Sequence, residues 1–207
     1  MFKGELRGAG QGPYADIGIG QIHIIDNSDA PVQYNVMGNV MSLLYEDQFQ
    51  TATQIGPYMT LQGLFSGSSV VNAKDLILPA TSLSSASYMK MFYGCTSLIS
   101  APALPATSLT DSCYSGMFNG CTSLTTAPVL PATTLAVWCY GSMFMNCTSL
   151  NYIKMMATEI NSSRNHLTNW VAGVGSTGTF VKNESATWTT TGVSGVPEGW
   201  AVETATE

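Results

Sequence analysis

The feature that most constrains this chain is a 26-residue segment that is written three times between residues 78 and 150. A Leu-Pro-Ala-Thr-x-Leu box occupies residues 78–83, 104–109 and 130–135. A Cys-Thr-Ser-Leu box follows each of them, at residues 95–98, 121–124 and 147–150. Self-similarity at a fixed period of this size is typical of a solenoid, in which each copy buries its apolar face against its neighbours. We therefore expect identical side chains of successive copies to stack in columns.

Apolar residues in the second half of each copy recur at intervals of three or four, which is the spacing of one face of a helix. In the second copy they are Leu109, Cys113, Met117, Cys121 and Leu124. Gly94, Gly120 and Asn146 stand at the far end of this stretch. Because Gly and Asn readily adopt the left-handed conformation that closes a helix, the pattern predicts a short helix in each copy.

The segment after this stretch, residues 124–130, is short, partly alternating and extended in character. Pro128 removes one backbone donor there, so strand pairing must be incomplete. A short strand and a short helix per copy predict an α/β repeat solenoid, a leucine-rich-repeat-like right-handed coil of about four rungs. The additional rung is a degenerate copy around residues 64–71.

Both ends of the array are expected to carry β-rich caps, because a solenoid end exposes apolar surface and an open strand edge. Residues 1–50 predict an N-terminal cap built on a hairpin of strands near 17–24 and 32–36. Residues 51–160 hold the repeats. Residues 161–207 predict a C-terminal cap with an amphipathic helix, whose apolar stripe is Leu167, Trp170, Val171 and Val174, and a hairpin of strands at 179–182 and 200–203.

Charged residues make up only 10% of the chain and the net charge is −6. Nucleic-acid binding requires clustered Lys and Arg, so this class is disfavoured. We also expect no membrane insertion, because no apolar run approaches the roughly 20 residues that span a bilayer. No apolar stretch typical of a signal peptide follows Met1. The chain is therefore expected either not to use that export route or to be a fragment of a longer exported protein.

The five cysteines fall into two columns at the repeat spacing: Cys95, Cys121 and Cys147, and Cys113 and Cys139. Stacked cysteines usually act as small buried hydrophobes, and the odd count also favours free thiols. Paired rungs lie about 4.8 Å apart, which is within reach of a disulfide, so bridging stays open as the alternative.

The combination of Met-Phe-x-Gly-Cys-Thr-Ser-Leu with Leu-Pro-Ala-Thr-x-Leu resembles the BspA-type leucine-rich repeats of bacterial surface proteins, above all in Bacteroides-like gut organisms. The similarity covers roughly residues 35–160, and the tail resembles a closing module that often follows such repeats. It implies a secreted or surface-anchored, non-enzymatic protein that binds host proteins, glycans or other bacteria, often with further domains upstream. Similar repeats occur in bacteriophage of the same hosts.

Few residues suggest catalysis, a cofactor or a metal, and none is expected. His23 and His166 lie in different predicted caps and are interpreted as structural or solvated. The sequence contains no nucleophile elbow, phosphate-binding loop or zinc-protease motif. Asp26 and Asp29 are interpreted as a self-bonded turn, with calcium binding as the less favoured alternative.

Binding residues are expected where the copies differ, because repeated positions are fixed by stacking. Trp138 replaces a small residue of the other copies, and exposed aromatics are enriched at recognition sites. The candidate binding residues are Trp138, Tyr152, Asp111 and Thr126. The column of Tyr88, Tyr114 and Tyr140 is interpreted as a packing ladder, with a binding stripe as the alternative.

Three hypotheses follow. The favoured one is an extracellular or cell-surface repeat module that adheres to a protein or glycan partner without chemistry. The second is a structural or assembly component of a surface appendage or phage virion. The third is an enzyme of unrecognised type, for which a cleft uniting His166, an acidic residue and a cysteine is the required sign.

Overall fold

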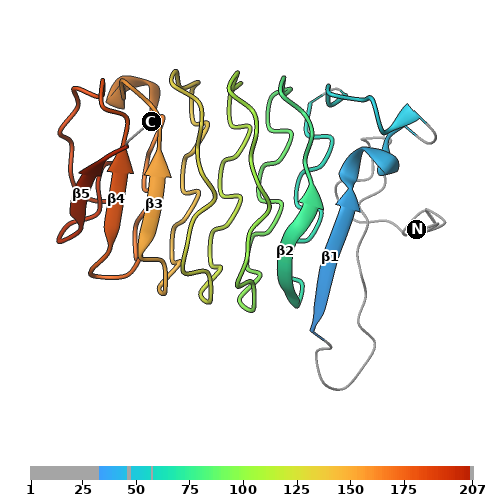
Figure 1. Cartoon of the computed structure of the whole chain (residues 1–207), viewed down its shortest axis with the longest axis horizontal. Coiled ribbons are helices and arrows are strands. Elements are labelled where there is room, and N and C mark those ends of the chain that lie inside the picture. The colour runs from blue at the N-terminus through green and yellow to red at the C-terminus, as the bar shows by residue number, and fades with distance from the viewer. Residues whose placement is uncertain (1–32, 46–47, 57, 206–207) are drawn as a thin grey trace.

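The computed structural model describes residues 33–45, 48–56 and 58–205, and the chain passes back and forth so that successive repeats lie side by side (Figure 1). Two small parallel sheets stand at opposite ends of this row. The first sheet pairs β1 (Tyr34–Asn39) with β2 (Val70–Ile77). The second has the order β3 (Tyr152–Met155), β4 (Thr179–Lys182) and β5 (Ala201–Thr204). Isolated parallel bridges such as Ser82 to Ser108 connect the repeats between them.

The predicted α/β leucine-rich-repeat coil is wrong. The described residues contain no α-helix; the short 3-10 segments Val40–Leu43 and Ser162–Arg164 lie outside the three regular copies. Regular strands are confined to the two small sheets. The half of each repeat that was expected to be helical consists of consecutive turns.

Backbone hydrogen bonds explain why this half is not helical. The amide of Met117 donates to the carbonyl of Tyr114 at 3.1 Å, which closes a four-residue turn. The next amide, Phe118, donates instead to Met143 of the following repeat at 3.0 Å. In an α-helix each of these amides would donate to the carbonyl four residues earlier. Alternate amides therefore bind within their own repeat and to the next one.

Every fourth residue of this turn-rich segment has a left-handed backbone. In the second repeat these are Ser112, Gly116 and Gly120, with φ of 58°, 62° and 78°. Each is the third residue of a turn, where a type II turn requires positive φ. The left-handed prediction for Gly94, Gly120 and Asn146 is confirmed, at φ of 71°, 78° and 61°, but these residues close turns and not a helix.

The predicted columns of like side chains are confirmed. Phe92 stacks on Phe118 with ring centroids 5.6 Å apart, and Phe118 stacks on Phe144 at 5.7 Å. The thiol of Cys121 donates to the Phe92 carbonyl at 3.1 Å, and that of Cys147 to the Phe118 carbonyl at 3.0 Å. All five cysteines are free and buried, so the expectation of thiols is confirmed.

The second column of rings is also part of the core. Tyr88, Tyr114 and Tyr140 are at most 1% exposed, and their rings stack at 5.7 and 6.1 Å. The packing-ladder interpretation of these tyrosines is therefore confirmed, and a binding stripe is excluded by their burial.

The C-terminal region differs from the predicted helix-and-hairpin cap. Leu167, Trp170 and Val171 are buried as expected, but they lie in turns. The two expected strands exist as β4 and β5, yet they pair in parallel and so form no hairpin. A parallel pair needs a connection that returns the chain to the same end, and residues 183–200 provide it.

Three tryptophans hold the C-terminal region together, and one of them, Trp188, bonds it to the repeats. The indole Nε1 of Trp170 donates to Gly195 O at 2.8 Å. Those of Trp188 and Trp200 donate to the carbonyls of Ala157 and Gly175, at 3.0 and 2.7 Å. Each buried indole thereby satisfies its one polar atom. The Trp170 ring also packs against Phe144 of the last regular repeat, with ring centroids 6.0 Å apart.

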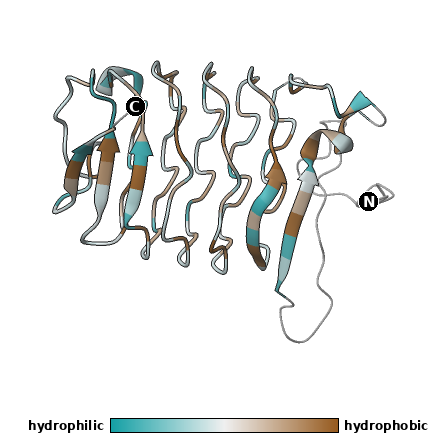
Figure 2. Cartoon of the chain, viewed as in Figure 1, coloured by the Kyte–Doolittle hydropathy of each residue, from teal (hydrophilic) through white to brown (hydrophobic). Residues whose placement is uncertain are grey.

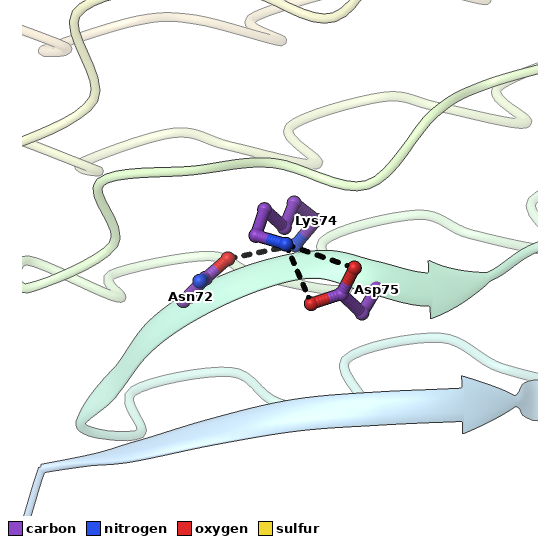
Figure 3. A network of polar contacts seen from close by, with 3 residues as sticks. All are labelled: Asn72, Lys74 and Asp75. Atoms are coloured by element: carbon purple, nitrogen blue, oxygen red, sulfur yellow. Dashed lines mark hydrogen bonds and ion pairs between the residues drawn. The ribbon is translucent and has the colours of Figure 1, made fainter.

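At the other end, the first strand expected for the N-terminal hairpin lies outside the described residues. The second overlaps β1, which pairs in parallel with β2. Figure 2 shows β2 as hydrophobic at both ends and hydrophilic between them. The hydrophilic part carries Lys74, which donates to Asp75 at 2.8 Å beside Asn72 (Figure 3). Both charged side chains are largely exposed, so the pair adds little stability.

The left-handed backbone at Gly120 gives a stability prediction. Gly120→Val should lower the free energy of unfolding by about 1 kcal/mol or more, because a β-branched residue resists positive φ. Gly120→Asn is the matched control, since Asn146 occupies the same position of the third repeat at φ 61°. Thermal unfolding should give a lower Tm for the Val variant than for the Asn variant; equal values would contradict the strain argument.

Candidate binding surface

The predicted binding residues fall into two pairs. Thr126 and Tyr152 form a parallel bridge between neighbouring repeats, so the structure brings these two together. Thr126 is exposed, and Tyr152, the first residue of β3, is half-buried. Trp138 and Asp111 lie instead in the turn-rich half of the third and second repeats, and both are exposed.

The position of Asp111 is fixed by the backbone ladder, that is, by the hydrogen bonds that join the turn-rich halves of neighbouring repeats. Its carbonyl oxygen accepts hydrogen bonds from the Ser85 hydroxyl at 2.9 Å and from the Ala86 amide at 3.0 Å. The following residue, Ser112, donates its amide to Val137, which precedes Trp138. Asp111 and Trp138 therefore lie on adjacent repeats, both in the turn-rich half.

Trp138 is held in an unusual backbone conformation. Its φ is 57°, close to the 55° and 58° of Ala86 and Ser112 in the same column, and its side chain is 38% exposed. A bulky side chain with a left-handed backbone is uncommon and costs free energy. The hydrogen bonds between repeats impose positive φ on Ala86, Ser112 and Trp138 alike. A large side chain at this position therefore costs conformational free energy.

Gly141 provides the room for the indole. A Cβ atom built at Gly141 would lie 2.6 Å from Cε3 of Trp138, which is closer than real contacts allow. The other copies carry Met89 and Ser115 at this position, beside the small residues Ala86 and Ser112. The sequence analysis identified Trp138 but missed Gly141. Gly141 could have been found because the third copy alone has a large residue at the first position and glycine at the second.

His166 lies in the repeat that follows Trp138. The Trp138 amide donates to Arg164 O at 3.3 Å, and the Tyr140 amide donates to His166 O at 3.1 Å. The imidazole is only 6% exposed, and its Nδ1 accepts the amide of Asn161 at 3.3 Å. Burial lowers the pKa of His166, and the nearby charge of Arg164 lowers it further. The structural interpretation fits this burial, whereas His23 lies outside the described residues.

The thiols are poor nucleophiles in this fold. Burial raises the pKa of Cys113, Cys139 and Cys147 to about 12 and also raises that of Cys95 and Cys121. A reactive cysteine needs a lowered pKa. Within the part of the chain that the structure describes, no three His, Cys, Asp or Glu side chains gather as a metal site would require.

Comparison with known proteins gives no match: no family model, curated protein or solved structure is significantly similar to this chain. Among the described residues, no helix is long and apolar enough to cross a membrane.

Gly141→Ala should displace the indole of Trp138, because the new methyl group would overlap Cε3. The chain has four tryptophans, so fluorotryptophan NMR should resolve four signals. We expect the signal that disappears in Trp138→Phe to shift in Gly141→Ala and to stay in place in Ser123→Ala, whose hydroxyl donates to the carbonyl of Thr96 and not to Gly141. An unmoved signal in Gly141→Ala would contradict the contact.

The lowered pKa of His166 predicts acid sensitivity. The folded state binds the proton less well than the unfolded state, whose histidine pKa is about 6.5. Stability should therefore fall as pH drops through about 6.5 and stop falling from this cause below the folded pKa. Unfolding in urea between pH 7.5 and 5 should show this dependence reduced in His166→Gln and retained in His23→Gln. An identical slope in wild type and His166→Gln would contradict it.

Proposed function

We propose that this chain is a non-enzymatic extracellular or cell-surface module that adheres to a protein or glycan partner. The observation that carries the proposal is Trp138, an exposed indole on a strained backbone above Gly141. Residues held in a strained backbone conformation cluster at functional sites. The resemblance of the Met-Phe-x-Gly-Cys-Thr-Ser-Leu and Leu-Pro-Ala-Thr-x-Leu motifs to BspA-type repeats, which rests on the sequence alone, implies the same class of function.

The surface of the neighbouring repeats is polar and includes the exposed Asp111 and Arg164. Around Trp138 the turns expose hydroxyl groups and the carboxylate of Asp111, and the exposed Thr126 lies beside Tyr152 on the strand side. An exposed aromatic ring offers a stacking platform for a sugar ring or a peptide side chain. The raised thiol pKa values remove the cysteines as nucleophiles, which supports binding over catalysis.

A structural or assembly component is the alternative, and one observation favours it. β5 pairs only with β4 among the described residues, and all four of its residues are exposed. An open strand edge is a template for pairing with another chain. Light scattering over a range of protein concentrations tests this alternative: concentration-dependent growth that Val202→Lys abolishes would favour assembly.

Binding of the purified chain to arrays of extracellular-matrix proteins and glycans tests the favoured function. Trp138→Ala should weaken binding at least about tenfold, as expected for a hot-spot aromatic, and Tyr152→Ala should weaken it less. Tyr93→Ala is the matched control, because Tyr93 is a similarly exposed aromatic, at 42% against 38%. No binding on either array, or equal binding by Trp138→Ala and wild type, would contradict the proposal.

A further inference from the structure

An interior column of side chains reaches the surface at the C-terminal end of the molecule. Ile153 of β3 pairs with Phe180 of β4, and Phe180 pairs with Val202 of β5. Because directly paired residues of neighbouring strands point to the same side of the sheet, Val202 continues the column that Ile153 and Phe180 form in the core. Ile153 and Phe180 are fully buried, whereas Val202 is 51% exposed. The last layer of the core is therefore uncovered at β5, the outermost strand of the row (Figure 1).

The backbone of β5 is open on the same side. The amide of Ala201 donates to the carbonyl of Gly178, next to β4, at 2.9 Å. In a parallel pair alternate residues bond to the same neighbour, so the amide and carbonyl groups of Val202 and Thr204 point away from β4. All four residues of β5 are exposed, and among the described residues β5 pairs with β4 alone. This edge can therefore accept one more strand.

An added strand has to meet two conditions. It must cover Val202 with an apolar side chain, and it must not place an acidic side chain opposite Glu203, because like charges directly opposite each other destabilise a strand pair. β5 of a second copy meets both conditions if it runs antiparallel about a two-fold axis at Val202. In this register Val202 lies opposite Val202 of the second copy, and Glu203 lies opposite Ala201. The neighbouring register pairs Val202 with Thr204 and is disfavoured, because it opposes the two Glu203 side chains.

We propose that this chain forms a closed two-fold dimer by antiparallel pairing of β5 with β5 of a second copy. The pairing joins the two three-stranded sheets into one and lets the two Val202 side chains cover each other. Because a two-fold interface uses the same surface of both copies, the dimer offers no further β5 edge for growth. The dimer differs in this respect from an open appendage, and it does not depend on the proposed adhesion function.

The dimer also has a consequence for adhesion. It carries the exposed indole of Trp138 twice in one particle. Two linked sites raise the overall avidity for a partner that both sites can reach, without any new contact at either site. Dimerisation through β5 therefore strengthens a binding surface that lies in other repeats.

Sedimentation velocity of the full chain over a wide range of concentrations tests the dimer. We expect monomers and dimers and no larger species. Val202→Lys should raise the dissociation constant at least about tenfold, because it places two like charges opposite each other at the centre of the pair. Val193→Lys is the matched control, since Val193 is also 51% exposed and the substitution changes the net charge equally. It should not weaken the dimer.

Cross-linking tests the register. In Val202→Cys the two introduced thiols lie on directly opposite residues, whose Cα atoms are about 5.5 Å apart in a hydrogen-bonded pair and so within disulfide range. Oxidised glutathione should therefore link two Val202→Cys chains faster than two Val193→Cys chains. The five native cysteines are buried and are not expected to react.

Four results would overturn the inference. They are a chain that stays monomeric at every concentration, growth beyond two copies, dissociation constants that Val202→Lys and Val193→Lys change equally, and cross-linking of Val202→Cys no faster than that of Val193→Cys. None of these results bears on Trp138, so the adhesion proposal stands or fails separately through Trp138→Ala on the arrays.

Discussion

The whole structure depends on backbone hydrogen bonds that alternate between two partners. In the turn-rich half of the second repeat, the amides of Cys113, Met117 and Cys121 close their own turns, and those of Tyr114 and Phe118 reach Cys139 and Met143 of the next repeat. Each such bond contributes only about 0.5–1.5 kcal/mol net, but unpaired buried amides would cost more. The alternation therefore pairs the amides in the turn-rich half of each interior repeat and requires each repeat to have a neighbour.

This ladder also sets where recognition can occur. Positions inside the columns are fixed by stacking of Phe, Tyr and Cys side chains, as the 5.6 Å spacing of Phe92 and Phe118 shows. Trp138 departs from its column while keeping the column's left-handed backbone, and Gly141 departs with it. A strained, exposed indole is the feature on which the proposed adhesion function rests, and the hydrogen bonds between repeats fix its backbone.

The columns, the free thiols, the buried tyrosines and the left-handed Gly120 followed from the repeat itself, because identical residues in register must occupy identical environments. The helix prediction failed because an exact four-residue interval was taken for a helical one. In an α-helix each step of four residues rotates the side chain by about 40°, so Leu109 and Cys121 would drift apart. Positive φ at Ser112 is imposed by hydrogen bonds between repeats, and serine has no local preference that would predict it. The pocket at His166 is lined by residues of the segment 160–168 and by Thr190 and Ser194, which lie beyond the regular copies, so the repeat pattern could not reveal it.

The most direct test of the alternating ladder is the detection of scalar couplings across hydrogen bonds by NMR on the deuterated chain. The structure predicts a coupling between the amide nitrogen of Phe118 and the carbonyl carbon of Met143, and one between the amide nitrogen of Met117 and the carbonyl carbon of Tyr114. A coupling from Phe118 to Tyr114 and from Met117 to Cys113, the pattern of an α-helix, would contradict the account.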